Sequence, residues 1–91
     1  MQHDLREASD RLLEISSRAT AAHDSIEQLR RQQEADGLGL RGDIAASLTR
    51  MNSYLQSANR DLGVRDVAEA NHNMDRAEVE LNKLEVFLGQ K

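Results

Sequence analysis

The 91-residue chain contains no cysteine, no proline and no tryptophan, and Tyr54 and Phe87 are its only aromatic residues. Without cysteine there is neither a disulfide framework nor a zinc–thiolate site. With so few aromatic side chains we do not expect a rigid ligand pocket, because such pockets are lined mainly by large apolar groups. The absence of proline, together with 31% charged residues, is typical of long solvated helices rather than sheets.

Long hydrophobic runs are also missing. No apolar stretch approaches the roughly 18 residues that a membrane-spanning helix needs. The first residues, Met1, Gln2, His3 and Asp4, do not form a basic region followed by a hydrophobic one, so they predict no secretory signal and favour a cytoplasmic location. The net charge of −4 disfavours nucleic-acid binding, which needs concentrated lysine and arginine. We expect one soluble all-α domain over residues 1–91.

The clearest helix signal covers residues 66–88. Asp66 stands three positions before Glu69, as in a capping box that satisfies the free amides of a helix N-terminus. Gly89 follows the stretch, where a left-handed C-cap suits glycine. Between these signals apolar residues recur at alternating spacings of 3 and 4, which places them on one stripe of a helix. They are Val67, Ala70, Met74, Ala77, Leu81, Leu84 and Leu88.

The same period runs through a longer helix predicted at about residues 4–35. Asp4 and Glu7 repeat the three-apart relation at its start, and Leu13 widens its stripe. Three acid-first pairs four residues apart, such as Glu14 with Arg18, indicate a solvated face. The stripe consists of Leu5, Ala8, Leu12, Ile15, Ala19, Ala22, Ile26 and Leu29.

A third, shorter helix is predicted at about residues 43–61. Asp43 is a suitable N-cap, and Gly63 marks its end. Three glycines between residues 37 and 42 separate it from the long helix, and we expect Leu38 and Leu40 in this turn to fold over the end of the bundle. Its stripe consists of Ile44, Leu48, Met51, Leu55, Ala58 and Leu62.

Three amphipathic helices with short connections predict an antiparallel up-down-up three-helix bundle with coiled-coil-like heptad stripes. The long helix exceeds the middle one by about 12 residues, or roughly 18 Å. The third helix or a partner must cover that excess.

Two short motifs suggest chemistry. Arg41, Gly42 and Asp43 form the tripeptide that resembles integrin-binding loops, although Gly42 and Asp43 are also explained as a helix breaker and a cap. Glu69 and His72 have the Glu-x-x-His spacing of metal-binding bundles, but no second copy exists and both lie off the apolar stripe. We predict no catalytic, cofactor-binding or metal site.

These features predict a non-enzymatic module for protein–protein interaction or oligomerisation. Its predicted mechanism is helix-face docking. The partner is another protein or a second copy of the chain, without nucleic acid and without a membrane span. Three alternatives remain open: a structural homo-oligomer or filament subunit, a linker or regulatory domain of a larger signalling or envelope protein, and a metal-binding bundle. The candidate interaction face consists of Ala19, Ala22, Ile26 and Leu29.

Overall fold

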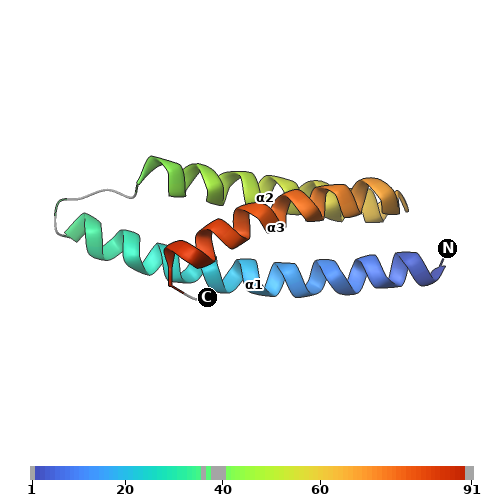
Figure 1. Cartoon of the computed structure of the whole chain (residues 1–91), viewed down its shortest axis with the longest axis horizontal. Coiled ribbons are helices and arrows are strands. Elements are labelled where there is room, and N and C mark those ends of the chain that lie inside the picture. The colour runs from blue at the N-terminus through green and yellow to red at the C-terminus, as the bar shows by residue number, and fades with distance from the viewer. Residues whose placement is uncertain (1, 36, 38–40, 90–91) are drawn as a thin grey trace.

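The computed structural model describes residues 2–35, 37 and 41–89, which form three α-helices and no strand. Helix α1 spans Gln2–Ala35, α2 spans Gly42–Gly63 and α3 spans Val67–Phe87. Figure 1 shows α1 and α3 running in the same direction and α2 running against both. The molecule is elongated, with extents of 52 × 20 × 16 Å. The predicted all-α three-helix bundle is confirmed.

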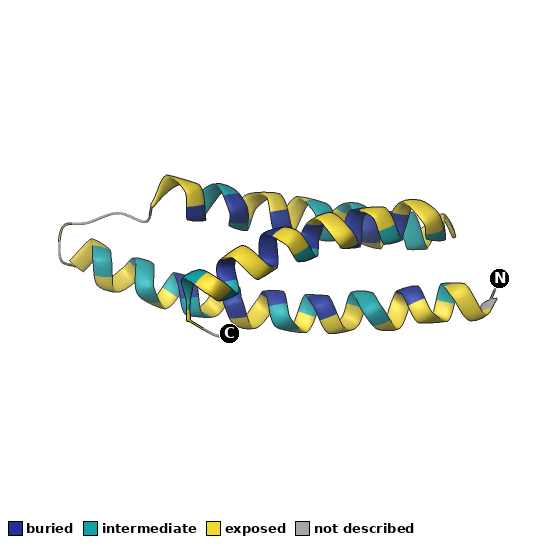
Figure 2. Ribbon diagram, in the orientation of Figure 1, coloured by how far each residue is buried: buried dark blue, intermediate teal, exposed yellow. Residues whose placement is uncertain are grey.

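The core consists of the three predicted stripes. All thirteen buried hydrophobic residues in the described part of the chain belong to them, and Figure 2 shows the buried positions on the helix faces that turn toward one another. Nearly half are alanines, whose small side chains let neighbouring helices approach closely. Larger side chains, each worth about 1.5 to 3 kcal/mol when fully buried, fill the space between the alanines. The largest of these are Ile15, Ile26, Met51, Met74, Leu81 and Leu84.

The predicted caps at the starts of α1 and α2 are wrong. Helix α2 begins at Gly42, and the carbonyl of Arg41 accepts the bond from the Ala45 amide at 3.0 Å. Asp43 therefore lies in the first turn rather than before it. Its carboxylate accepts a hydrogen bond from the Ile44 amide at 3.0 Å, a position where negative charge is favoured by the helix dipole. Asp4 likewise lies within the first turn of α1.

The chain reverses between α2 and α3 at Arg65 and not at Gly63. Gly63 is still helical, whereas Arg65 has a φ of 62°. The Arg65 amide bonds to the Leu62 carbonyl at 3.0 Å and the Asp66 amide to the Asp61 carbonyl at 2.8 Å, which is the pattern of a Schellman motif. The predicted cap of α3 is confirmed, because the Asp66 side chain accepts from the Glu69 amide at 3.2 Å. Gly89, with a φ of 74°, is also left-handed as predicted.

The C-terminal end of α1 is poorly covered by the other two helices. After Ile26 no described residue of α1 is buried, and Leu29 is half-buried. Figure 1 shows α3 ending alongside α1 well before α1 itself ends, so α3 does not cover the whole excess length. Leu38 and Leu40, predicted to fold over this end, lie outside the described residues.

Candidate interaction surface

Two arginines join α1 to α3. Arg11 donates from Nη2 to Asp75 Oδ1 at 2.7 Å and to Glu78 Oε1 at 3.0 Å. Arg18 contacts Glu78 at 3.2 Å and Glu85 at 2.8 Å. The predicted pairing of Arg18 with Glu14 on its own helix is therefore wrong, because Arg18 binds carboxylates of α3 instead. Helix α3 offers a row of polar acceptors beside its apolar stripe, at the same spacings of 4 and 3: Asn71, Asp75, Glu78, Asn82 and Glu85.

A buried carboxylate joins α2 to α3. The Glu80 side chain is only 10% exposed, and its Oε1 accepts a hydrogen bond from Arg50 Nη2 at 3.2 Å. Lys83 Nζ forms an ion pair with the same oxygen at 3.7 Å. Burial by itself raises the pKa of Glu80, but hydrogen bonds from Arg50 and Ser47 and the charges of Lys83 and Arg50 outweigh it and leave that pKa below its ordinary value. Helix α2 is thus held to α3 by charge as well as by packing.

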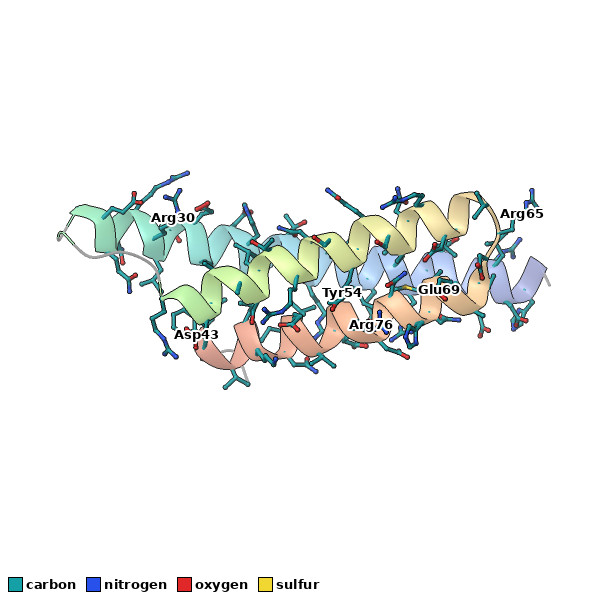
Figure 3. The ribbon with its side chains drawn as sticks, turned by 90° about the horizontal axis from the view of Figure 1, so that it is seen from above. Arg30, Asp43, Tyr54, Arg65, Glu69 and Arg76 are labelled. Atoms are coloured by element: carbon teal, nitrogen blue, oxygen red, sulfur yellow. The ribbon has the colours of Figure 1, made fainter. Side chains whose placement is uncertain are left out.

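Two further contacts lie along the same helix pair. Asn73, which is buried, donates from its amide to Asp61 at 2.7 Å. Arg76 lies over the ring of Tyr54, 5.9 Å from its centroid, and Figure 3 shows these two side chains side by side between the helices. Such a cation–π contact is worth about 0.5 to 1 kcal/mol where it is exposed.

Nothing comparable joins α1 to α2. Among the described residues, every side-chain hydrogen bond or ion pair between helices has α3 as one partner. Two adjoining clefts run between α1 and α2 instead, and Ser16 and Asn59 line both of them. We call these two clefts together the α1–α2 groove. Its α1 wall consists of Ser9, Leu12, Leu13, Ser16, Ala19, Thr20 and His23, and its α2 wall of Asn52, Leu55, Gln56, Asn59, Leu62 and Gly63.

The α1–α2 groove contains no aspartate, glutamate, lysine or arginine, although these residues make up 31% of the chain. Half-buried leucines form its floor, exposed amides line the α2 wall, and Leu13 stands on the rim with 68% of its surface exposed. From Ser9 to His23 the groove extends about 21 Å along α1. That length matches about four turns of a helix.

The face predicted for docking is largely occupied by the chain itself. Ala19, Ala22 and Ile26 are buried in the core with exposures of 4% or less, and Leu29 is half-buried. Of these four, only Ala19 also lines the α1–α2 groove. In the folded chain these side chains do not form an open surface, and their contact with a partner stays a prediction. Leu13, predicted to widen the stripe, points to solvent instead.

The two motifs with suggested chemistry have ordinary surroundings. Arg41 and Asp43 bind each other, with Nη2 and Oδ2 2.7 Å apart, and this pairing lowers the pKa of Asp43. Arg41 also lies 5.8 Å from the centroid of the Phe87 ring. Glu69 and His72 are both exposed. The described part of the chain contains no group of three side chains able to hold a metal ion.

Comparison with known proteins gives no relative. No family model, no curated protein and no solved structure matches the chain. None of the helices in the described ranges is long and apolar enough to cross a bilayer.

Proposed function

We propose that this chain is a non-enzymatic interaction module that docks a helical protein segment in the α1–α2 groove. One observation carries the proposal: over about 21 Å no aspartate, glutamate, lysine or arginine lines the groove and no bond between described polar side chains closes it, while both other helix pairs are linked by arginines. Depletion of charge marks the centre of protein interfaces, because desolvating a charge there is costly.

The walls of the groove suit a helix as the docked element. Residues on each wall recur every three or four positions, so the groove runs parallel to two helix axes, and a third helix laid between them completes a four-helix arrangement. Leu13 would supply an apolar anchor. Covering its exposed surface contributes about 1 to 2 kcal/mol, enough for a weak contact to depend on it.

The other two faces are less suitable. The outer edge between α1 and α3 presents Arg11 and Arg18 with their carboxylate partners, and the edge between α2 and α3 presents Arg50 and Lys83. A partner covering these edges would have to remove water from charges that are now partly solvated. The attraction gained by pairing those charges seldom outweighs this desolvation cost. The α1–α2 groove imposes no such cost.

A displayed library of helical peptides of about 14 residues, the length of the groove, tests the proposal. The library is panned against the wild-type chain, and selected peptides are then measured against two variants. Leu13→Glu places a charge on the groove rim, and Val79→Glu places the same charge on α3, at a position that is 53% exposed and outside the groove. We expect peptides that bind the wild type and Val79→Glu equally and lose at least tenfold affinity, about 1.4 kcal/mol, for Leu13→Glu. Peptides that bind Leu13→Glu as well as the wild type would contradict the proposal.

A further inference from the structure

We infer that the segment docked in the α1–α2 groove comes from a second copy of this chain, whose own α1–α2 face packs against the first about a two-fold axis. This inference rests on the proposed function and names its partner. In a two-fold contact the same patch occurs on both sides, so each residue near the axis meets itself or its close neighbours. The patch must therefore be complementary to an identical patch on the second copy.

Charge restricts the answer to one face. The chain has a net charge of −4, and a charged residue near a two-fold axis meets a like charge on the other copy, which opposes association. The edges of α3 with α1 and with α2 carry several arginines and glutamates. The α1–α2 groove carries none, so two copies can bring this face together without local repulsion.

The polar groups of the groove also suit a contact with themselves. Asn52, Gln56 and Asn59 are exposed on the α2 wall, and each amide has both a donor and an acceptor. An amide can therefore form a hydrogen bond with the same amide of another copy. A carboxylate only accepts hydrogen bonds and an ammonium group only donates them, so neither can pair with its own copy. The same property lets a buried asparagine pair with its own copy in coiled-coil dimers.

Shape points to the same partner. Leu13 forms a ridge on the rim, and the cleft between Leu12 and Leu62 lies directly beside it. At Gly63, which ends this cleft, an added Cβ would meet nothing within 4 Å. One face thus presents both a projection and a recess, so a two-fold contact can seat each Leu13 in the recess of the other copy.

The size of the groove predicts a weak dimer. The groove extends about 21 Å along α1. With the 20 Å width of the molecule it covers about 420 Å² on each chain, or about 840 Å² in total, which is below the range of stable specific interfaces and typical of weak, transient ones. We expect a dimer with a dissociation constant in the high micromolar range.

Sedimentation equilibrium of the full chain, from about 5 to 500 µM, tests the inference. The wild type and Val79→Glu should associate with the same constant, and Leu13→Glu should associate at least tenfold more weakly. Gln56→Glu and Gln56→Lys provide a second test at an exposed position of the groove. Each should weaken association alone, because like charges then face each other, and mixing the two should restore it. Circular dichroism of each variant checks that a loss of association is not a loss of helical structure.

Each outcome separates the two proposals. A wild type that stays monomeric throughout overturns the second copy as partner, and the proposed function then depends on the peptide selection alone. A dimer that tolerates Leu13→Glu but not Val79→Glu lies on α3 and overturns the second copy as the partner in the groove, while the peptide selection still decides the proposed function. Failure of the Gln56 mixture to recover association overturns the two-fold contact even when Leu13→Glu weakens the dimer.

Discussion

Arg50→Met removes the guanidinium that binds Glu80 between α2 and α3, while methionine keeps much of the aliphatic stem. The Arg50 side chain is 47% exposed and that of Glu80 is 10% exposed. Exposed ion pairs are worth about 0.2 to 1 kcal/mol, whereas removal of one partner from a fully buried pair costs about 3 to 5 kcal/mol. This pair is buried on one side only, so we expect a loss of about 1 to 2 kcal/mol in the free energy of unfolding at neutral pH.

The loss should depend on pH in a defined direction. In the wild type the pKa of Glu80 lies below its ordinary value, so its contribution to stability is present above the unfolded glutamate pKa of about 4.3 and is lost as the pH falls through the lower folded value. Without Arg50 the effect of burial is less opposed, and the pKa of Glu80 is higher than in the wild type. The stability difference between the two chains should therefore shrink as the pH falls from about 7 to below about 4.

Urea unfolding followed by circular dichroism at several pH values measures this difference, with equal slopes as the check that both chains unfold in the same way. Arg60→Met is the matched control, because Arg60 lies on the same helix, is exposed and makes no ion pair with a described residue. It should cost less than about 0.5 kcal/mol at every pH. A loss in Arg50→Met that is equal at all pH values, or no larger than in Arg60→Met, would refute the reasoning.

Three further changes have distinct expected results. Leu81→Ala, at a fully buried position, should lower the free energy of unfolding by about 2 to 5 kcal/mol in urea; a loss below 1 kcal/mol would mean that the core is loosely packed there. Arg18→Met, which breaks contacts with Glu78 and Glu85, should cost about 1 kcal/mol in dilute buffer and less in about 1 M salt; a salt-independent cost would contradict an electrostatic role. Gly63→Ala, at a helical glycine with open space around it, should raise the melting temperature by adding about 0.5 to 1 kcal/mol of stability; a decrease would mean that this residue needs glycine's backbone freedom.

The core could be predicted from the sequence because its signal is local. Residues such as Met74 and Leu81 recur with the helical period, and no knowledge of the partner helices is needed to place them inside. The ends of the helices were harder to predict. A glycine such as Gly63 usually marks a helix end. Here the hydrogen bonds that close α2 are donated by the amides of Arg65 and Asp66, and the Asp66 side chain also caps α3. The three-residue connection, Val64 to Asp66, therefore places the left-handed residue at Arg65.

The polar contacts could not be predicted because their partners are distant in the chain. Arg11 has acidic neighbours on its own helix, yet its partner Asp75 lies 64 residues away, and only the packing of α1 on α3 brings them together. The α1–α2 groove could not be predicted for a related reason. The apolar stripe containing Ala22 and Ile26 predicts a docking face from the period alone, and in the bundle both residues are buried, whereas the groove depends on how α1 and α2 pack. A signal was present in the sequence: from Ile44 to Asn59, Arg50 is the only charged residue.

The central place of α3 has a consequence for the order of folding. Helix α3 has seven buried residues, compared with four in α2. Among the described residues, the side-chain bonds that α1 and α2 make to another helix all reach α3. The turn from α2 to α3 is very short, so closing this hairpin costs little chain entropy. We expect the α2–α3 hairpin to form early and α1 to join it late, with the Arg11 and Arg18 contacts made after the folding barrier. Mutations at those arginines should then speed unfolding and leave the folding rate almost unchanged.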